Sequence, residues 1–311
     1  MIRVTLCFVF IILLTAQNSF TEGVRLFDQK NYDASKDIFE EIVDENDENK
    51  EAWYYLAQIN YHLKDYNEST ENFEEFIERK DTRLDQLNFY LDALEKHVKE
   101  VSTFSKLSVG KRMVEVFKRV LVFEPENIRI NKRLIGFYLN APGFVGGDEE
   151  EGLKMLRFLK TIAPIDAGKI LVRFYLDEEE EEKALSAIKD LEEFDMFEAK
   201  IMMFRFQLQK ENLPEALSTL TTLESLKSEK HYFNLYNQLG YHYLKLELYD
   251  EAIQAFLKQV ELAPNRANSY DSLGDGYRAI DDIKNALIAY RKAVEIDPTF
   301  EASVDNIEEL E

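Results

Sequence analysis

The sequence is poor in the residues that build disulfides, tight turns and breaks between domains. It has one cysteine, Cys7, with eleven glycines and six prolines in 311 residues. A single cysteine forms no internal disulfide and no cysteine zinc site. No Gly/Ser linker divides the chain. The scarcity of helix-breaking residues therefore predicts an almost entirely helical protein.

Residue patterns with a catalytic mechanism are also missing. The four histidines (His62, His97, His231 and His242) include no pair at i and i+4 and no His-Glu-x-x-His motif. No Gly-rich phosphate loop and no Gly-x-Ser-x-Gly elbow occurs. We therefore predict no catalytic residue, no metal and no cofactor. An exported enzyme stays an alternative, which a buried carboxylate pair would favour.

Positive charge is in short supply. The chain has 38 Lys and Arg against 60 Asp and Glu, a formal net charge of −22. Binding to nucleic acid or anionic membranes needs cations that neutralise phosphates, so we expect neither partner. Acidic residues cluster at 44–48, 148–151 and 177–182. Calcium binding is one interpretation, but without EF-hand spacing solvated edges at helix starts are favoured.

The N-terminus has the pattern of a targeting signal. Arg3 is the only charged residue before Glu22, and residues 4–14 are apolar apart from Thr5. This run suits a secretory signal peptide over 1–16 better than a membrane span. Cys7 lies inside the apolar run, so lipid attachment is not expected. We predict export to the periplasm or cell exterior without stable membrane insertion; an uncleaved N-terminal anchor is the alternative.

The C-terminal part contains a repeat with a period of 34 residues. Its first copy reads Tyr236, Leu239, Gly240, Tyr243, Ala252, Phe256 and Pro264, and its second reads Tyr270, Leu273, Gly274, Tyr277, Ala286, Tyr290 and Pro298. The small residues make room where two helices cross, the aromatic residues fill the space between them, and each proline follows a second helix.

This pattern resembles the tetratricopeptide repeat, a helix–turn–helix unit of the same length. The resemblance implies an all-α, right-handed superhelical solenoid of antiparallel helix pairs. Because one such unit cannot bury its apolar face alone, its neighbours are expected to be repeats too. The C-terminal residues 301–311 are expected to form a helix that caps the last repeat.

The same spacing continues upstream in weaker form. Trp53, Leu56, Ala57, Ser69 and Phe73 mark one unit, in which Ser69 stands where other units have alanine. Apolar residues between 84 and 101 recur every three or four positions, which predicts an unusually long first helix. We predict eight helix pairs, at 20–49, 50–83, 84–127, 128–164, 165–196, 197–230, 233–266 and 267–300.

One segment interrupts the pattern. Residues 141–148 read Ala-Pro-Gly-Phe-Val-Gly-Gly-Asp, and the proline and three glycines argue against helix. The turn resembles one found in bacterial tetratricopeptide proteins. Asp148 is expected to cap the next helix. Phe144 and Val145 are the candidate exposed residues of a partner-contacting loop.

The resemblance also implies a binding surface, because the first helices of tetratricopeptide pairs line a groove that takes peptides or helices. Carried onto this chain, the groove candidates are Tyr54, Gln58, Tyr61, His62, Arg129, Lys132, Lys169, Arg173, Arg205, Asn237, Tyr241 and Arg278, with Asp271 and Asp275 among them. The central candidates are basic, which would favour a partner with an acidic segment. Ordinary solvated cations are the alternative.

Asn237 and Tyr241 stand where chaperone adaptors would need Lys and Asn, so no chaperone-tail binding is predicted. The leading functional hypothesis is a non-catalytic scaffold of the cell envelope or exterior that binds a protein or peptide. A transporter-accessory or small-ligand-binding repeat protein is the alternative.

Overall fold

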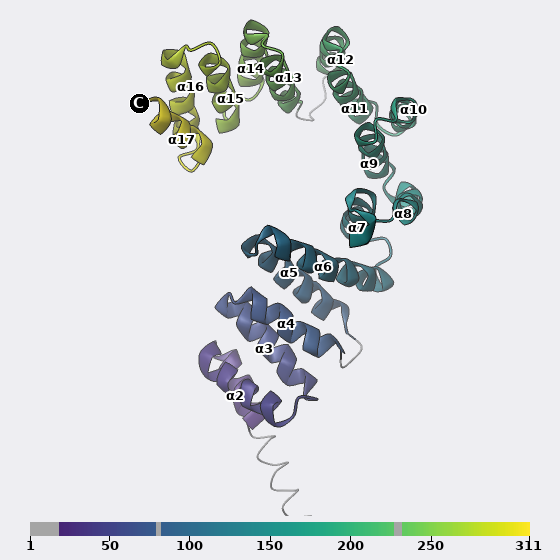
Figure 1. Cartoon of the computed structure of the whole chain (residues 1–311), viewed down its shortest axis with the longest axis vertical. Coiled ribbons are helices and arrows are strands. Elements are labelled where there is room, and N and C mark those ends of the chain that lie inside the picture. Colours follow the sequence, from purple (N-terminus) through teal and green to yellow (C-terminus); the bar gives the residue numbers. More distant parts are fainter. Residues whose placement is uncertain (1–18, 79–81, 227–231) are drawn as a thin grey trace, which may run out of the picture. The chain divides into compact units, whose positions relative to one another are not determined.

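The computed structural model describes residues 19–78, 82–226 and 232–311 (Figure 1). The predicted signal peptide over 1–16, with Cys7, lies outside the described residues. Internal contacts divide the chain into two units, residues 1–162 and residues 163–311. Each unit is described by itself below.

The first unit consists of helices joined by short turns. A helix over 19–28 precedes α2 (Tyr32–Glu45). The remaining helices are α3 (Lys50–Leu63), α4 (Tyr66–Glu78), α5 (Leu84–Glu100), α6 (Thr103–Phe123), α7 (Ile128–Asn140) and α8 (Glu149–Ile162). Consecutive helices pack as antiparallel pairs, because turns of a few residues leave no other arrangement.

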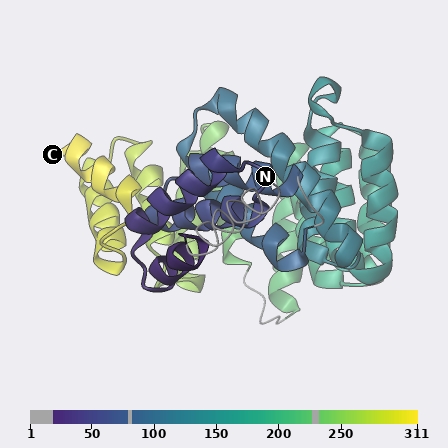
Figure 2. The same cartoon turned by 90° about the horizontal axis from the view of Figure 1, so that it is seen from below.

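The second unit continues in the same way. It contains α9 (Pro164–Asp177), α10 (Glu181–Glu192), α11 (Met196–Gln209), α12 (Leu213–Ser225), α13 (Phe233–Lys245), α14 (Tyr249–Leu262), α15 (Ala267–Arg278), α16 (Ile283–Ile296) and α17 (Glu301–Leu310). The ranges that the structure describes contain no strand (Figures 1 and 2). The all-α prediction is confirmed.

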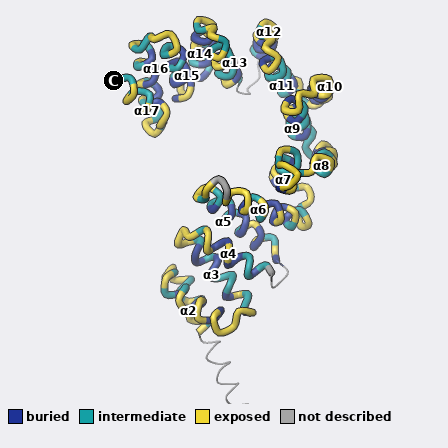
Figure 3. Tube along the Cα trace, in the orientation of Figure 1, coloured by how far each residue is buried: buried dark blue, intermediate teal, exposed yellow. Residues whose placement is uncertain are grey.

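Small residues set the distance between the helices of a pair. A Cβ at Gly240 would lie 2.4 Å from the Phe256 ring, and one at Gly274 would lie 2.4 Å from the Tyr290 ring. Ser69, fully buried, donates from Oγ to the Ala57 carbonyl at 2.8 Å. Buried and exposed residues alternate along the helices, as expected when one side faces a partner helix (Figure 3).

Six turns inside the pairs end their first helix in the same strained conformation. One to three positions after the helix, a residue adopts a positive φ between 55° and 67°: Lys30, Lys64, Glu179, Glu211, Glu247 and Asp281. The next amide then donates back across the turn, as in Asp65 N to Asn60 O at 2.9 Å. This is the Schellman motif, in which glycine is the usual residue at the positive φ.

The pair α5/α6 and the turn after α7 depart from this design. Helices α5 and α6 have 17 and 21 residues, and α5 ends in extended backbone at Val101. After α7, Gly143–Val145 form a 3-10 turn. This segment contains no α-helix, as expected, but it does contain this short 3-10 helix. Asp148 accepts from the Glu151 amide at 3.1 Å, which confirms that it caps α8.

None of the helices in the described ranges combines the length and the apolar character needed to cross a membrane.

Candidate functional site

The central basic candidates gather where α9 and α11, the first helices of consecutive pairs, lie side by side in the second unit. Lys169 of α9 forms an ion pair with Glu198 of α11 at 2.8 Å. Further along both helices, Gln209 Nε2 donates to the Leu176 carbonyl at 2.8 Å. These two contacts fix the register of the helices and place Arg173 and Arg205 in the stretch between them.

Arg173 and Arg205 carry charges that the protein leaves unpaired. Neither guanidinium makes a hydrogen bond or ion pair with any residue that the structure describes. Arg173 is exposed and Arg205 is partly buried. Burial and the positive charge of Arg173 both lower the pKa of Arg205, whereas Glu198 raises it. A guanidinium group can bind a carboxylate bidentately, and here two lie on adjacent helices without an ion-pair partner among the described residues.

Lys169 differs from these two arginines because its charge is already matched. The Glu198 carboxylate is only 16% exposed and stays beside Lys169. The sequence-based site treated the three cations alike and missed Glu198. No pattern in the sequence separates this glutamate from its many acidic neighbours.

The basic candidates of the first unit have partners inside the protein. Arg129, on α7, contacts Glu95 of α5 at 3.5 Å, and Arg133 contacts the same carboxylate. Lys132 is partly buried and interacts within the protein. Arg129 and Arg133 therefore share one internal carboxylate, which partly neutralises this part of the predicted groove.

The aromatic candidates of α3 divide between two surfaces. Tyr61 donates its hydroxyl proton to Asp92 on α5, which raises the pKa of Tyr61 to about 12. His62 instead stacks on Tyr32 of α2 with ring centroids 4.7 Å apart, and burial lowers the pKa of His62. Tyr61 therefore lies on the side of α3 that faces the next pair, and His62 on the side that faces the preceding one.

The other two α3 candidates make contacts within their own pair. The ring of Tyr54 packs on Phe73 and Phe76 of α4, with ring centroids 5.6 and 5.0 Å apart. Gln58 donates from Nε2 to the Tyr54 carbonyl at 3.3 Å. Tyr54 therefore contributes to the packing of the first unit.

Asn237 and Tyr241 belong to a polar network between α13 and α15. Asn237 donates to Ser272 at 2.6 Å, and the Tyr241 hydroxyl donates to Asp275 at 2.5 Å. Burial, together with the Asp275 hydrogen bond, raises the pKa of Tyr241. Because these groups satisfy one another, they hold the two first helices in register.

The C-terminal helix α17 covers the last groove candidates. Arg278 donates to Asn306 and pairs with Glu309, each at 2.9 Å. Asp271 is 6% exposed and accepts from Ser303 at 2.7 Å. The expectation that Asp271 faces an open groove is therefore wrong, because α17 packs on α15 at this position.

The two loop candidates have opposite environments. Phe144 is 85% exposed, whereas Val145 is 8% exposed. The expectation that Val145 is exposed is therefore wrong. The 3-10 turn is closed by hydrogen bonds from Val145 N and Gly147 N to the Pro142 carbonyl, at 2.9 and 3.2 Å. Consecutive residues of this turn point in different directions, and Val145 points inward.

The ranges that the structure describes contain no cluster of three or more His, Cys, Asp or Glu able to hold a metal ion.

These features define an α-helical repeat protein whose exposed first helices present polar side chains. The tetratricopeptide repeat profile matches residues 20–81 and residues 232–299. The chain is a tetratricopeptide repeat protein, as the resemblance predicts. A search of curated proteins finds no match.

Several solved structures are similar to this chain. A tetratricopeptide repeat protein from Parabacteroides merdae is 14% identical, with a TM-score of 0.49, over 84% of this chain and 98% of that one. The C-terminal part of a repeat protein from Cytophaga hutchinsonii is 14% identical, with a TM-score of 0.39, over 93% and 99%. YrrB, described as having an unusual peptide-binding site, is 16% identical, with a TM-score of 0.36, over 63% and 99%.

Proposed function

We propose that this protein is a non-catalytic scaffold that binds a protein or peptide partner through the first helices of its pairs. Tetratricopeptide repeats generally mediate interactions between proteins, and this chain carries them near both ends. The surface between α9 and α11 that contains Arg173 and Arg205, the arginine site, binds an acidic segment of the partner. The unpaired charge of these two arginines is the observation that carries the proposal.

The electrostatic argument follows from the contrast with the rest of the chain. In a protein with a net charge of −22, Arg129 of the first unit has an internal acidic partner, Glu95, whereas Arg173 and Arg205 have none among the described residues. Arg205 is partly desolvated and repelled by Arg173, so an incoming carboxylate relieves an existing cost as well as adding hydrogen bonds. Each charge-assisted hydrogen bond contributes about 1.5–3 kcal/mol.

The same charge distribution supports a partner that is not nucleic acid, since phosphate backbones would meet a predominantly acidic surface. An enzyme is less well supported. Burial, and to a smaller extent the charge of Asp275, raise the pKa of Asp271, as in a catalytic carboxylate pair. Both are engaged inside the protein, Asp271 by Ser303 and Asp275 by Tyr241 and Tyr290, which favours a structural role.

Peptide titration tests the proposal. A fluorescein-labelled alternating Glu-Ala peptide is titrated with the whole protein and followed by fluorescence anisotropy, beside a matched Gln-Ala peptide. We expect saturable binding of the Glu peptide that weakens as salt rises from about 50 to 300 mM. Combined Arg173→Gln and Arg205→Gln changes should weaken binding at least tenfold, since they remove two charge-assisted contacts.

The matched control combines Lys189→Gln with Lys284→Gln, which changes the net charge equally at exposed positions on α10 and α16. This control should bind like the wild type. Equal weakening by both double variants would mean that only net charge matters, and the arginine site would be rejected.

We also propose that the protein is exported, on the strength of its apolar N-terminal segment. N-terminal sequencing of the protein from the exported fraction should begin at Gln17. A start at Met1 in that fraction would support the uncleaved anchor instead.

A further inference from the structure

A cavity of about 350 Å³ lies between α4, α5 and α6 in the first unit. Its apolar walls come from Ile77, Tyr90 and Val116. Its cationic lining comes from Lys111, Arg112 and Arg119, all on α6. Its volume falls in the range of small-ligand sites, about 300–1,000 Å³. This cavity is separate from the arginine site, which belongs to the second unit.

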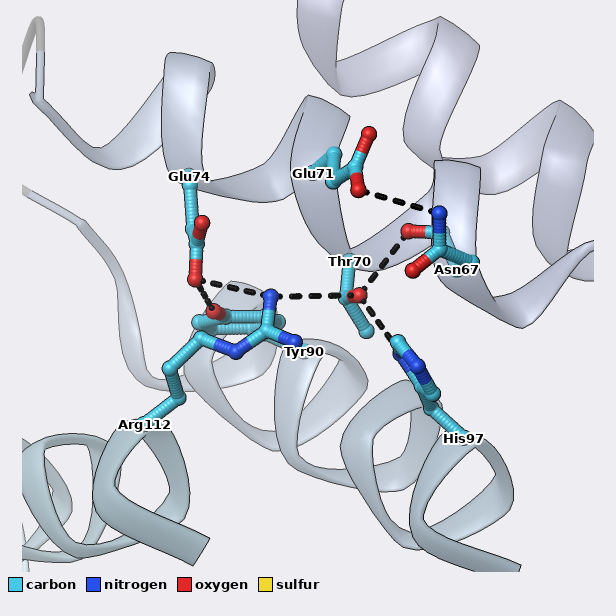
Figure 4. Close-up of polar contacts among 7 residues, drawn as sticks. All are labelled: Asn67, Thr70, Glu71, Glu74, Tyr90, His97 and Arg112. Atoms are coloured by element: carbon cyan, nitrogen blue, oxygen red, sulfur yellow. Dashed lines mark hydrogen bonds and ion pairs between the residues drawn. The ribbon is translucent and has the colours of Figure 1, made fainter. Parts of the chain in front are cut away.

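A partly buried polar network fixes one side of the cavity (Figure 4). Glu74 accepts from the Tyr90 hydroxyl at 2.9 Å and from Arg112 Nη1 at 3.0 Å. Arg112 Nη1 also reaches the Thr70 hydroxyl at 3.5 Å. Burial and the Glu74 charge raise the pKa of Tyr90, so this hydroxyl stays protonated. The guanidinium of Arg112 is thus held in one orientation at the cavity wall.

The network extends behind Arg112 to a buried histidine. Thr70 donates its hydroxyl proton to the Asn67 carbonyl at 2.9 Å, so the 2.9 Å contact with His97 Nδ1 is one in which His97 donates. Burial and the charge of Arg112 lower the pKa of His97, which keeps it neutral. His97 therefore adds no positive charge beside Arg112.

The cavity has more positive charge than its own carboxylates neutralise. Glu74 is engaged by Arg112 and Tyr90, and Glu115 pairs with Lys118 at 2.8 Å. Lys111 has no ion pair with any described residue, and Arg119 binds the Thr82 hydroxyl but no described carboxylate.

We propose that this cavity binds a small amphipathic anion: a carboxylate carried on an apolar chain or ring. The apolar part packs against Ile77, Val116 and the Tyr90 ring, where it is removed from water. The carboxylate binds Lys111 and Arg119, which have no carboxylate partner among the described residues and which a neutral ligand of the same shape leaves unpaired.

Octanoate is the probe, with 1-octanol as its neutral counterpart. Isothermal titration of the whole protein should show saturable octanoate binding and at least tenfold weaker octanol binding. Methyl NMR should show that the Ile77 and Val116 methyl signals shift with the same dissociation constant. Binding of octanol as tight as octanoate, or octanoate binding that leaves these two methyl signals unmoved, would overturn the proposal.

Variants separate charge from folding. Combined Lys111→Gln and Arg119→Gln changes should weaken octanoate binding at least fivefold. Combined Lys99→Gln and Lys106→Gln changes, at exposed positions on α5 and α6 outside the cavity, should leave it unchanged. Circular dichroism melting establishes that each variant folds. Unchanged octanoate binding in the folded cavity variant contradicts the proposal.

The arginine-site variant provides the last control. Combined Arg173→Gln and Arg205→Gln changes should leave octanoate binding intact, because the cavity lies in the other unit. Loss of octanoate binding in that variant would place the anion at the arginine site and reject the cavity.

Discussion

At the scale of single residues, the surroundings of a charged side chain determine its role more than the residue type does. Lys169 and Arg173 lie one helical turn apart on α9, yet Glu198 neutralises the first and leaves the second unpaired. Sequence spacing predicted that these side chains share a surface. It could not predict the neutralisation, because that depends on which of many acidic residues the packing brings within ion-pair distance.

Asp271 gives a test of a buried charge. Burial raises its pKa, so its folded state favours the protonated form, and the stability it contributes is lost as pH rises through the folded-state pKa. Asp271→Asn should therefore raise the melting temperature at pH 7 and lose this advantage near pH 4. The asparagine oxygen can still accept from Ser303. Thermal melts across this pH range check the sign, and an advantage that grows towards acid would contradict it.

At the scale of elements, the pairs depend on close helix crossings and on strained turns. The sequence predicted the crossings well, because Gly240 and Gly274 occupy matching repeat positions and Ser69 stands where other units have alanine. The turns were not predictable in detail. The residues at positive φ are Lys, Glu or Asp, so the usual glycine signal is missing.

Gly274→Ala tests the crossing. The new Cβ would lie 2.4 Å from the ring of Tyr290, which is fully buried and held by a 2.8 Å hydrogen bond to Asp275. We expect a loss of about 1–3 kcal/mol in the free energy of unfolding. Gly136→Ala on α7 is the control, because its Cβ meets nothing within 4 Å. That change should stabilise by about 0.5–1 kcal/mol. Urea unfolding gives both values, and equal effects would reject the repeat register.

Glu179→Gly tests the turn. Glu179 has a φ of 57° and is exposed within an acidic run. Glycine removes a strain of about 1–2 kcal/mol but adds unfolded-state entropy of about 0.5–1 kcal/mol. We expect net stabilisation of roughly 0.5–1 kcal/mol. The neighbouring Glu178→Gly change, at a φ of −82°, removes the same charge and should destabilise. Destabilisation by both substitutions would contradict the account.

At the scale of the whole molecule, the excess of acidic residues affects both stability and partner choice. The periodicity predicted a helical repeat protein throughout, although α5, α6 and the 3-10 turn depart from the pattern. The candidate groove was predicted as one continuous surface. In the structure its members fall into distinct sets, because internal ion pairs, the Tyr241–Asp275 contact and α17 satisfy most of them.

Salt should stabilise the protein as a whole. With a net charge of −22, screening reduces repulsion among carboxylates, whereas the exposed ion pairs it also weakens contribute little each. Raising sodium chloride from about 10 to 150 mM should increase the melting temperature by about 2–4 °C, equivalent to roughly 1 kcal/mol. A falling melting temperature would show that ion pairs outweigh the repulsion.

The central claim is that Arg173 and Arg205 recognise carboxylates on a partner. A charge-swap titration tests it most directly: alternating Glu-Ala and Lys-Ala peptides are each titrated against the wild type and against the Arg173→Glu/Arg205→Glu double variant. We predict that the wild type binds the Glu peptide more tightly than the double variant does. We also predict that the double variant gains at least tenfold in affinity for the Lys peptide. Equal affinity of the two proteins for the Glu peptide would contradict the claim.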